Sequence, residues 1–209
     1  MSDSIKTTGM TIEQMSDQYF DVLKEIGNIG AGNATTALST MLGTRVDMMV
    51  PKVRLMEFKE VGTTLGGEEQ LVAGIYLVVN GDIHGSIMFV QKKESARAMV
   101  QKLMGMPPEG EDFSEMELSA LKEIGNVITG AYLNSLSTLT NLTIYPSVPD
   151  ICIDMAGAIL SVPAIEFGAV SDKMLLIQTD FADDKEMSGY FILVPDEESD
   201  EKILHALGF

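Results

Sequence analysis

Between Phe20 and Gly32, hydrophobic and polar positions alternate with the period of an α-helix. Leu23, Ile26 and Gly30 fall on one side of a helical wheel, and Phe20 lies at the edge of that side. A helix with one hydrophobic face normally packs that face against a core. The segment is therefore predicted to be an amphipathic helix.

The opposite face of this helix carries a polar stripe. Asp21, Glu25, Asn28 and Gly32 lie within about 60° of one another on the wheel, away from the hydrophobic side. We expect this stripe to face solvent. Because Gly32 has no side chain, it leaves space beside the Asn28 carboxamide for another molecule to approach.

The same pattern occurs again 98 residues further along the chain. The sequence LKEIGNIGAG at Leu23–Gly32 is matched by LKEIGNVITG at Leu121–Gly130, and the same offset relates Pro51 to Pro149. The second polar stripe consists of Ser119, Glu123, Asn126 and Gly130, and its hydrophobic face of Leu118, Leu121, Ile124 and Ile128. The chain therefore contains two copies of one unit.

The ends of both helices also carry recognisable signals. Thr11–Gln14 and Ser114–Glu117 fit the capping-box pattern, in which a hydroxyl and a later Glu or Gln bond to free backbone N–H groups. Gly43 and Asn141, again 98 residues apart, are the two residue types that most readily end a helix in the left-handed conformation. Each helix should then have about 25 to 30 residues and a length of roughly 40 Å.

Strand-like segments follow each long helix, and a short helix closes each half. The predicted strands are Met48–Phe58, Leu71–Val79, Gly85–Val90, Val148–Met155, Leu175–Thr179 and Gly189–Val194; the predicted closing helices are Ser95–Met104 and Asp200–Leu207. A hairpin turn is predicted at Asn80–Asp82, and the halves should meet near Met106–Asp112.

The expected fold class is α+β, built from an internally duplicated α-β-β-β-α unit. Residues 1–108 form the first half and residues 109–209 the second, and together they should make one compact domain with pseudo-two-fold symmetry. We expect a largely antiparallel sheet with the two long helices on one face.

The repeated Glu and Asn positions are the candidate functional residues. A single polar stripe usually means only that a helix faces water. However, Asn costs a helix interior roughly 0.5 kcal/mol relative to Ala, and both copies place one there. Exposed faces of duplicated halves are expected to diverge. The Glu and Asn of the stripe are nevertheless the same in both copies, whereas other equivalent residues, such as Gly30 and Ile128, differ. A function therefore explains the repeated pair better than solvation alone.

The chemistry available to a Glu–Asn pair is limited. A carboxamide both donates and accepts hydrogen bonds and hardly titrates, so it can hold a water molecule in line with a leaving group. A carboxylate can pair with a cationic side chain. No Ser-His-Asp or Cys-His set suggests covalent catalysis. These residues are suited to positioning a water and a partner.

Composition narrows the possible partners. The net charge is −17, from 31 acidic and 14 basic residues, which argues against nucleic-acid and membrane partners. No apolar run approaches the roughly 20 residues that cross a bilayer, and the N-terminus does not resemble a secretory signal. One cysteine, Cys152, cannot form an internal disulfide. We therefore expect a cytoplasmic protein.

Three further sequence features could suggest additional functional sites, but each has a simpler structural explanation. The sequence GNIGAG at Gly27–Gly32 resembles a phosphate-binding loop, but it lies within a predicted helix and no strand precedes it. His84 and His205 are far apart and have no neighbouring Cys or His, so a zinc site is not expected. Cys152 alternates like a half-buried strand residue and is predicted to lie in the core.

The pattern D/S-x3-E-x2-N-x22-P, at Asp21, Glu25, Asn28 and Pro51 and again in the second copy, resembles the CheC-type phosphatases of bacterial chemotaxis. That family also includes CheX and FliY. The resemblance covers almost the whole chain. CheX proteins are shorter and carry one site, and FliY has an additional C-terminal domain. The two intact sites and the end of this chain at Phe209 favour the CheC branch.

The resemblance implies hydrolysis of the aspartyl phosphate on the response regulator CheY. Asn28 and Asn126 would orient the attacking water, and Glu25 and Glu123 would contact a lysine of the regulator. The remaining matched residues, Asp21, Gly32, Pro51, Ser119, Gly130 and Pro149, would shape the two sites. No cofactor of the chain's own is implied, since the regulator would supply magnesium. The implied second partner is the receptor deamidase CheD, and we expect a monomer.

An alternative function is a non-catalytic binding module. The same kind of fold serves as a scaffold in flagellar switch proteins, and a scaffold could bind phosphorylated regulator only to sequester it. The repeated Asn argues against this alternative, because a scaffold has no need of it. Asp21 differs from Ser119 in the second copy, so the two sites could also differ in rate.

Overall fold

The computed structural model describes residues 17–43, 45–105, 107, 110–167, 173–181 and 188–209. Along the chain the elements are α1 (Asp17–Leu42), β1 (Met48–Glu57), α2 (Phe58–Thr64), β2 (Leu71–Gly81), β3 (Gly85–Lys92), α3 (Lys93–Met104), α4 (Glu115–Thr140), β4 (Ile144–Pro146), β5 (Asp150–Met155), α5 (Ala156–Phe167), β6 (Lys173–Phe181), β7 (Gly189–Pro195) and α6 (Glu197–Ala206).

All described strands join one seven-stranded sheet with the order β1-β6-β7-β3-β2-β4, and β5 also pairs with β2. Every pairing is antiparallel. The strands β1, β2 and β3 of the first half correspond to β5, β6 and β7 of the second half. Replacing each strand by its counterpart gives the same order read backwards, which is the arrangement that a pseudo-two-fold axis between β3 and β7 produces. The first strand of each half therefore pairs with the second strand of the other half.

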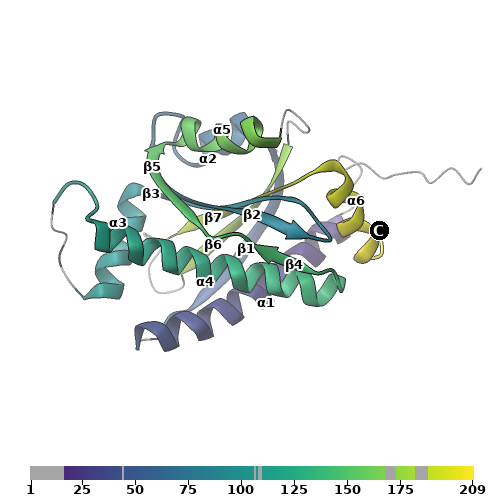
Figure 1. The fold of residues 1–209 in the computed structure, drawn as a ribbon, viewed down its shortest axis with the longest axis horizontal. Coiled ribbons are helices and arrows are strands. Elements are labelled where there is room, and N and C mark those ends of the chain that lie inside the picture. The colour runs from purple at the N-terminus through teal and green to yellow at the C-terminus, as the bar shows by residue number, and fades with distance from the viewer. Residues whose placement is uncertain (1–16, 44, 106, 108–109, 168–172, 182–187) are drawn as a thin grey trace, which may run out of the picture.

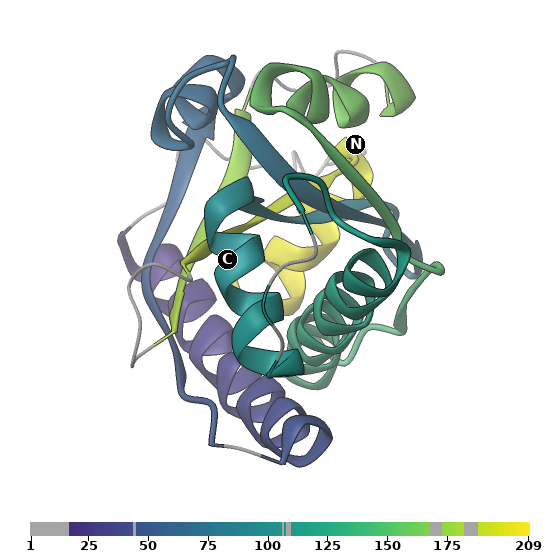
Figure 2. The same cartoon turned by 90° about the vertical axis from the view of Figure 1, so that its left-hand side faces the viewer.

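Helices cover both faces of the sheet (Figures 1 and 2). The long helices α1 and α4 lie along one face, and α2 and α5 lie over the other. The main core, between the long helices and the sheet, includes Ile26, Ile128 and Phe191. A second core lies under the short helices and includes Val61 and Leu160. In the described part of the chain, no helix is both long and apolar enough to cross a membrane.

The predicted long helices are confirmed. Both α1 and α4 contain 26 residues. The capping box at Ser114–Glu117 is present, and Gly43 (φ 61°) and Asn141 (φ 57°) adopt the left-handed conformation at the two helix ends. The predicted capping box at Thr11–Gln14 lies outside the described residues.

The structure corrects the predicted unit in three places. Helices α2 and α5 were not predicted, so each half has an additional short helix after its first strand. Helix α5 is apolar on all sides and contains Pro163, so it lacks the periodicity that reveals an amphipathic helix. The predicted strand Val148–Met155 is β5, which begins two residues later at Asp150, and the short strand β4 before it was not predicted. The turn predicted at Asn80–Asp82 falls slightly later, between β2 and β3.

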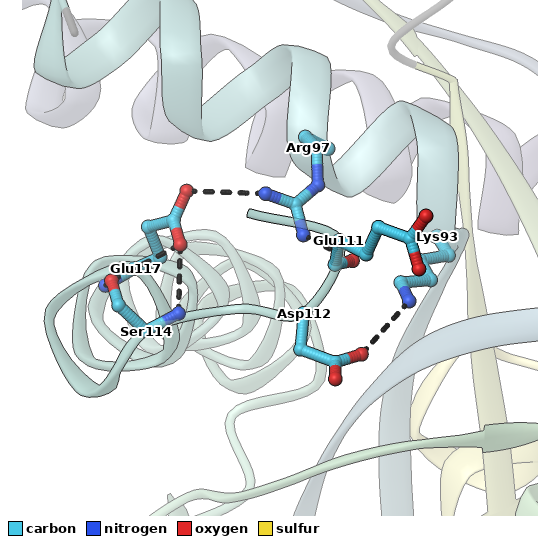
Figure 3. A network of polar contacts seen from close by, with 6 residues as sticks. All are labelled: Lys93, Arg97, Glu111, Asp112, Ser114 and Glu117. Atoms are coloured by element: carbon cyan, nitrogen blue, oxygen red, sulfur yellow. Dashed lines mark hydrogen bonds and ion pairs between the residues drawn. The ribbon is translucent and has the colours of Figure 1, made fainter. Parts of the chain in front are cut away.

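Polar contacts fix the N-terminus of α4 against α3 (Figure 3). The backbone N–H of Ser114 donates to Glu117 Oε2 at 2.7 Å, and Arg97 Nη1 lies 3.4 Å from Glu117 Oε1. Arg97 also donates to the carbonyl of Glu111 at 2.8 Å and lies 4.3 Å above the ring of Phe113. These contacts hold the first turn of the helix that carries the second polar stripe.

Glycines allow the long helices to approach their neighbours closely. A Cβ on Gly30 would lie 3.1 Å from the backbone of Tyr132 in α4, and a Cβ on Gly27 would lie 3.2 Å from Val50 in β1. A Cβ on Gly125 would collide with the side chain of Ile75 in β2. The glycines on the inner face of each helix are therefore required by packing.

Two glycines of α4 should respond in opposite ways to the same substitution. Gly125→Ala forces a methyl group into Ile75, so we expect the free energy of unfolding to fall by about 2 kcal/mol. A methyl group at Gly130 would meet no atom within 4 Å, so Gly130→Ala should raise the free energy of unfolding by up to about 1 kcal/mol. Urea unfolding of both variants measures the difference. Equal effects would contradict the packing argument.

Candidate functional site

The first polar stripe lies on the solvent side of α1, as predicted. Asp21, Glu25, Asn28 and Gly32 are all exposed. The hydrophobic residues on the opposite side are buried, and Ile26 is only 4% exposed. The helix therefore presents a carboxylate and a carboxamide to solvent, one turn apart.

The second polar stripe has the same placement on α4 but is less open. Ser119 and Glu123 are exposed, whereas Asn126 and Gly130 are half-buried. The hydrophobic side is again in the core, where Ile128 is fully buried. Both stripes therefore survive in the folded protein, with somewhat different access to solvent.

Each stripe ends at a glycine that leaves open space. A Cβ added to Gly32 or to Gly130 would have no atom within 4 Å. These two glycines therefore differ from Gly27 and Gly125, which lie against neighbouring strands. The structure supports the expectation that a partner can approach the helix surface beside each Asn.

A β-bulge in β1 brings the strand into contact with the first stripe. Met49 pairs with Asp180 and Lys52 pairs with Gln178, so β1 has one residue more than β6 over this interval. The backbone N–H of Val50, within the bulge, donates to Asn28 Oδ1 at 3.1 Å. This contact was not foreseen from the sequence, although the proline that follows Val50 is a typical sign of an irregular strand.

The second half has an extra residue at the equivalent place. Val79 pairs with Pro146 and Tyr76 pairs with Asp150, so the chain between β4 and β5 also has one residue more than its partner strand. In this half the hydrogen bond runs between the irregular segment and its partner strand. The Oγ of Ser147 accepts from the backbone N–H of Val78 in β2 at 3.0 Å. The irregularity is shared by both halves, but its hydrogen bonding is not.

The valine in each irregular segment differs strongly in exposure between the halves. Val50 is 1% exposed, whereas Val148 is 80% exposed. Pro149, next to Val148, is buried instead. The side chain of Pro51 lies outside the part of the chain that the structure describes. Among the described residues Asn126 has no hydrogen-bond partner that corresponds to the Val50 N–H.

These contacts give the two carboxamides different freedom. The oxygen of Asn28 faces the Val50 N–H, so its nitrogen points away from the strand and can donate to an incoming group. The oxygen retains a second lone pair that can accept a hydrogen bond from water. Asn126 makes no such hydrogen bond within the part of the chain that the structure describes. The first site is therefore more preorganised than the second.

The phosphate-loop alternative is contradicted by the position of GNIGAG. The segment lies in the middle of α1, where its backbone N–H groups are within a continuous helix. Gly30 is buried and faces Tyr132 of α4. Among the described residues, no group of three His, Cys, Asp or Glu side chains is arranged to hold a metal ion.

The prediction for Cys152 is wrong. Cys152 is exposed, and it lines a cavity of about 450 Å³ between β5 and α5 together with Ile159 and Val162. Alternation along a strand assigns residues to two faces, but it does not show that a helix covers only part of one face. The cavity lies on the side of the sheet opposite to α1 and α4, away from both stripes.

The fold and the doubled stripe together define a class of protein: a duplicated α+β domain that presents a Glu-x-x-Asn face twice. The CheC-like family model matches residues 21–54 and 116–153. These two segments contain all ten candidate site residues, each segment running from a long helix into the strand that follows. The family match therefore falls on the repeated helix and first strand of each half.

Curated relatives extend the match to nearly the whole chain. The chain is 36% identical over 93% of its length to the CheY-P phosphatase CheC of Bacillus subtilis, and the match covers 96% of that protein. It is 31% identical over 66% of its length to the flagellar motor switch phosphatase FliY of Bacillus subtilis, covering 36% of that protein. The chain belongs to the CheC-like family.

Solved structures show the same fold at lower identity. FliY of Thermotoga maritima aligns with a TM-score of 0.70 and 24% identity, covering 92% of this chain and 97% of that chain. FliM in a complex with SpeE from H. pylori aligns with a TM-score of 0.67 and 15% identity, covering 93% and 96%. The fold of this chain is thus shared with these FliY and FliM structures.

The difference between the two carboxamides predicts a difference in stability. Asn28→Ala leaves the N–H of buried Val50 without its acceptor, which should lower the free energy of unfolding by about 1 kcal/mol after the gain in helix propensity is subtracted. Asn126→Ala removes no such bond, so it should be neutral or stabilising by a few tenths of a kcal/mol. Urea unfolding measures both variants. The argument fails if Asn126→Ala is the more destabilising of the two.

Proposed function

We propose that this chain is a phosphatase that hydrolyses the aspartyl phosphate of a phosphorylated CheY-type response regulator. The observation that carries the proposal is the Glu-x-x-Asn stripe on the outer side of both long helices, which is fully exposed on α1 and partly exposed on α4 and ends each time at a glycine with open space beside it. The 36% identity to the CheY-P phosphatase CheC of Bacillus subtilis over nearly both chains supports the same activity.

In the proposed mechanism, Asn28 and Asn126 position the attacking water. Asn28 is exposed and Asn126 is half-buried, and both lie on the helix side that faces away from the core and can approach the phosphorylation site of a regulator. Its oxygen accepts a hydrogen bond from water, while its nitrogen donates to a phosphoryl oxygen. Phosphoryl transfer requires little covalent chemistry from the enzyme, because alignment and charge stabilisation lower most of the barrier.

Glu25 and Glu123 have the docking role in this mechanism. Each is exposed and lies three residues before the Asn of its stripe, so the two side chains are about 5 to 6 Å apart at their Cβ atoms. An ion pair between this carboxylate and a lysine of the regulator would fix the position of the Asn against the phosphoryl group.

The remaining roles fall to the regulator and to the site-shaping residues. The regulator supplies magnesium, which neutralises charge on the transferred group. Asp21 and Ser119 extend the stripes, the strand segment around Pro51 holds Asn28 through the Val50 N–H, and Pro149 occupies the equivalent place in the second half. The proposal also includes CheD as a second partner, a cytoplasmic location and a monomeric chain.

A catalytic role and a sequestering role make different predictions for the Asn residues. Decay of a phosphorylated CheY-type regulator should be accelerated by wild-type protein, less by Asn28→Ala or Asn126→Ala alone, and by at least about 100-fold less by the double variant. Affinity for a beryllofluoride-activated regulator should change little in the double variant. A double variant that still accelerates decay would show that the stripe serves only for binding.

Access to the helix surface can be tested at the open glycines. Gly32→Leu combined with Gly130→Leu should preserve the fold, because both positions face open space, but should reduce regulator affinity at least about tenfold by obstructing the approach. Thr40→Leu combined with Thr138→Leu is the matched control, since these exposed residues lie two turns further along the same helices. Fluorescence titration measures both. Equal losses in the two pairs would contradict the proposed approach.

A further inference from the structure

An exposed isoleucine lies beside the first polar stripe. Ile29 directly follows Asn28 and is 40% exposed, whereas Ile26 on the inner face of the same helix is 4% exposed. On the helical wheel Ile29 lies about 40° from Glu25, on the side of the stripe away from Asn28. The outer side of α1 therefore presents a large apolar side chain to solvent next to its carboxylate.

The geometry of the helix directs Ile29 towards Glu25. Residues four apart in an α-helix are neighbours on its surface, with Cβ atoms about 5 to 6 Å apart. Because side chains lean towards the N-terminus of their helix, Ile29 covers the turn that carries Glu25. On the following turn, a Cβ at Gly32 would meet no atom within 4 Å, so Ile29 stays open to an approaching molecule.

The side chain of Ile29 is also nearly fixed before any partner arrives. An isoleucine within a helix strongly prefers one χ1 rotamer, because its two branches would otherwise meet the preceding turn. Such a side chain loses little conformational entropy when a partner covers it. Ile29 is therefore suited to forming an apolar contact at the helix surface.

The second half has a valine at the equivalent position. Val127 also lies four residues after the Glu of its stripe, but it is half-buried and packs against the main core. Both copies thus place an apolar residue beside the Glu, and the first site exposes it more. A single exposed hydrophobic residue is common on protein surfaces, so the argument for Ile29 depends on what Glu25 binds.

In the proposed mechanism, Glu25 binds a lysine of the regulator. A lysine side chain has two parts, an ammonium group that pairs with a carboxylate and a four-carbon stem that covers apolar surface. When the ammonium group is at the Glu25 carboxylate, Ile29 lies within reach of the stem, because the two helix residues are neighbours. The pair Glu25 and Ile29 therefore matches both parts of one lysine.

Covering the ion pair also changes its strength. An ion pair in open water contributes little, since the solvent screens both charges. At a lower effective dielectric constant the same two charges attract each other several times more strongly. Apolar contacts that surround a polar interaction strengthen an interface by keeping water away from it.

We propose that Ile29 is a specificity-determining residue of the first site, which packs on the stem of the regulator lysine and excludes water from the ion pair with Glu25. This inference rests on the proposed phosphatase function. It assigns Ile29 to binding of the regulator and not to the hydrolysis step.

Steady-state dephosphorylation in an Asn126→Ala background measures the first site alone. In this background Ile29→Ala should raise KM about fivefold with kcat unchanged, whereas Ile29→Leu should keep KM within about twofold of the parent. The urea midpoint should not fall in either variant, because Ile29 is exposed and both replacements are better helix formers. An unchanged KM in Ile29→Ala, or a lower urea midpoint, would overturn the proposal.

A double-mutant cycle tests whether Ile29 acts on the ion pair. Glu25→Gln removes the carboxylate, so the effect of Ile29→Ala on KM should shrink from about fivefold to about twofold or less when both substitutions are present. Equal effects with and without Glu25 would contradict the proposed role, because Ile29 would then bind the regulator independently of the lysine.

A matched control separates this position from apolar surface elsewhere on α1. Met41 is 43% exposed and lies about 18 Å further along the same helix. Met41→Ala also removes exposed apolar surface, but away from Glu25, and should leave KM unchanged. A rise in KM equal to that of Ile29→Ala would overturn the assignment, because any loss of apolar surface from the helix would then suffice.

The failure of the proposed function has a different signature. If the Asn28→Ala Asn126→Ala double variant dephosphorylates the regulator as fast as wild-type protein, neither stripe is catalytic and both proposals are overturned. If the double variant is inactive while Ile29→Ala has no effect on KM, only the role of Ile29 is overturned.

Discussion

The close packing of each long helix against the sheet is the constraint on which the rest of the structure depends. Gly27 and Gly125 bring their helices so near to a strand that a single added methyl group would meet Val50 or Ile75. Because the inner face of each helix is fixed in this way, the outer face is fixed as well. The orientation of Glu25 and Asn28 is therefore a consequence of core packing on the other side of the same helix.

The sheet makes the two halves depend on each other. The first strand of each half pairs with the second strand of the other half, so neither half completes its own sheet. In addition, Gly30 of α1 contacts the backbone of Tyr132 in α4, and Asn33 donates to Ser135 across the same helix pair. A change in one half is thus transmitted to the other through shared strands and a shared helix contact.

The architecture itself does not specify catalysis. FliM of H. pylori shares the fold at 15% identity, which shows that one duplicated scaffold serves proteins with different sequences. In this chain the scaffold carries a carboxylate and a carboxamide on the outer side of each long helix, and a strand irregularity follows each helix. The irregularity frees a backbone N–H that would otherwise pair within the sheet, and in the first half Asn28 accepts it.

The sequence by itself determined the duplication, the long helices and their polar stripes, because these depend on local periodicity and on capping residues that act within a few positions. Ser114 and Asn141 bound α4 at the residues expected of them. Helix α5 and the short strand β4 were missed, since an apolar helix has no face to reveal it and a short strand depends on its partner strand.

Only the tertiary structure decided that Val50 is buried while Val148 is exposed, and that Cys152 faces solvent. Val50 and Val148 each precede a proline at equivalent positions but have different neighbours across the sheet. Burial and hydrogen bonding are set by those neighbours. The difference in burial and hydrogen bonding between the two sites could therefore not be derived from the sequence pattern that the sites share.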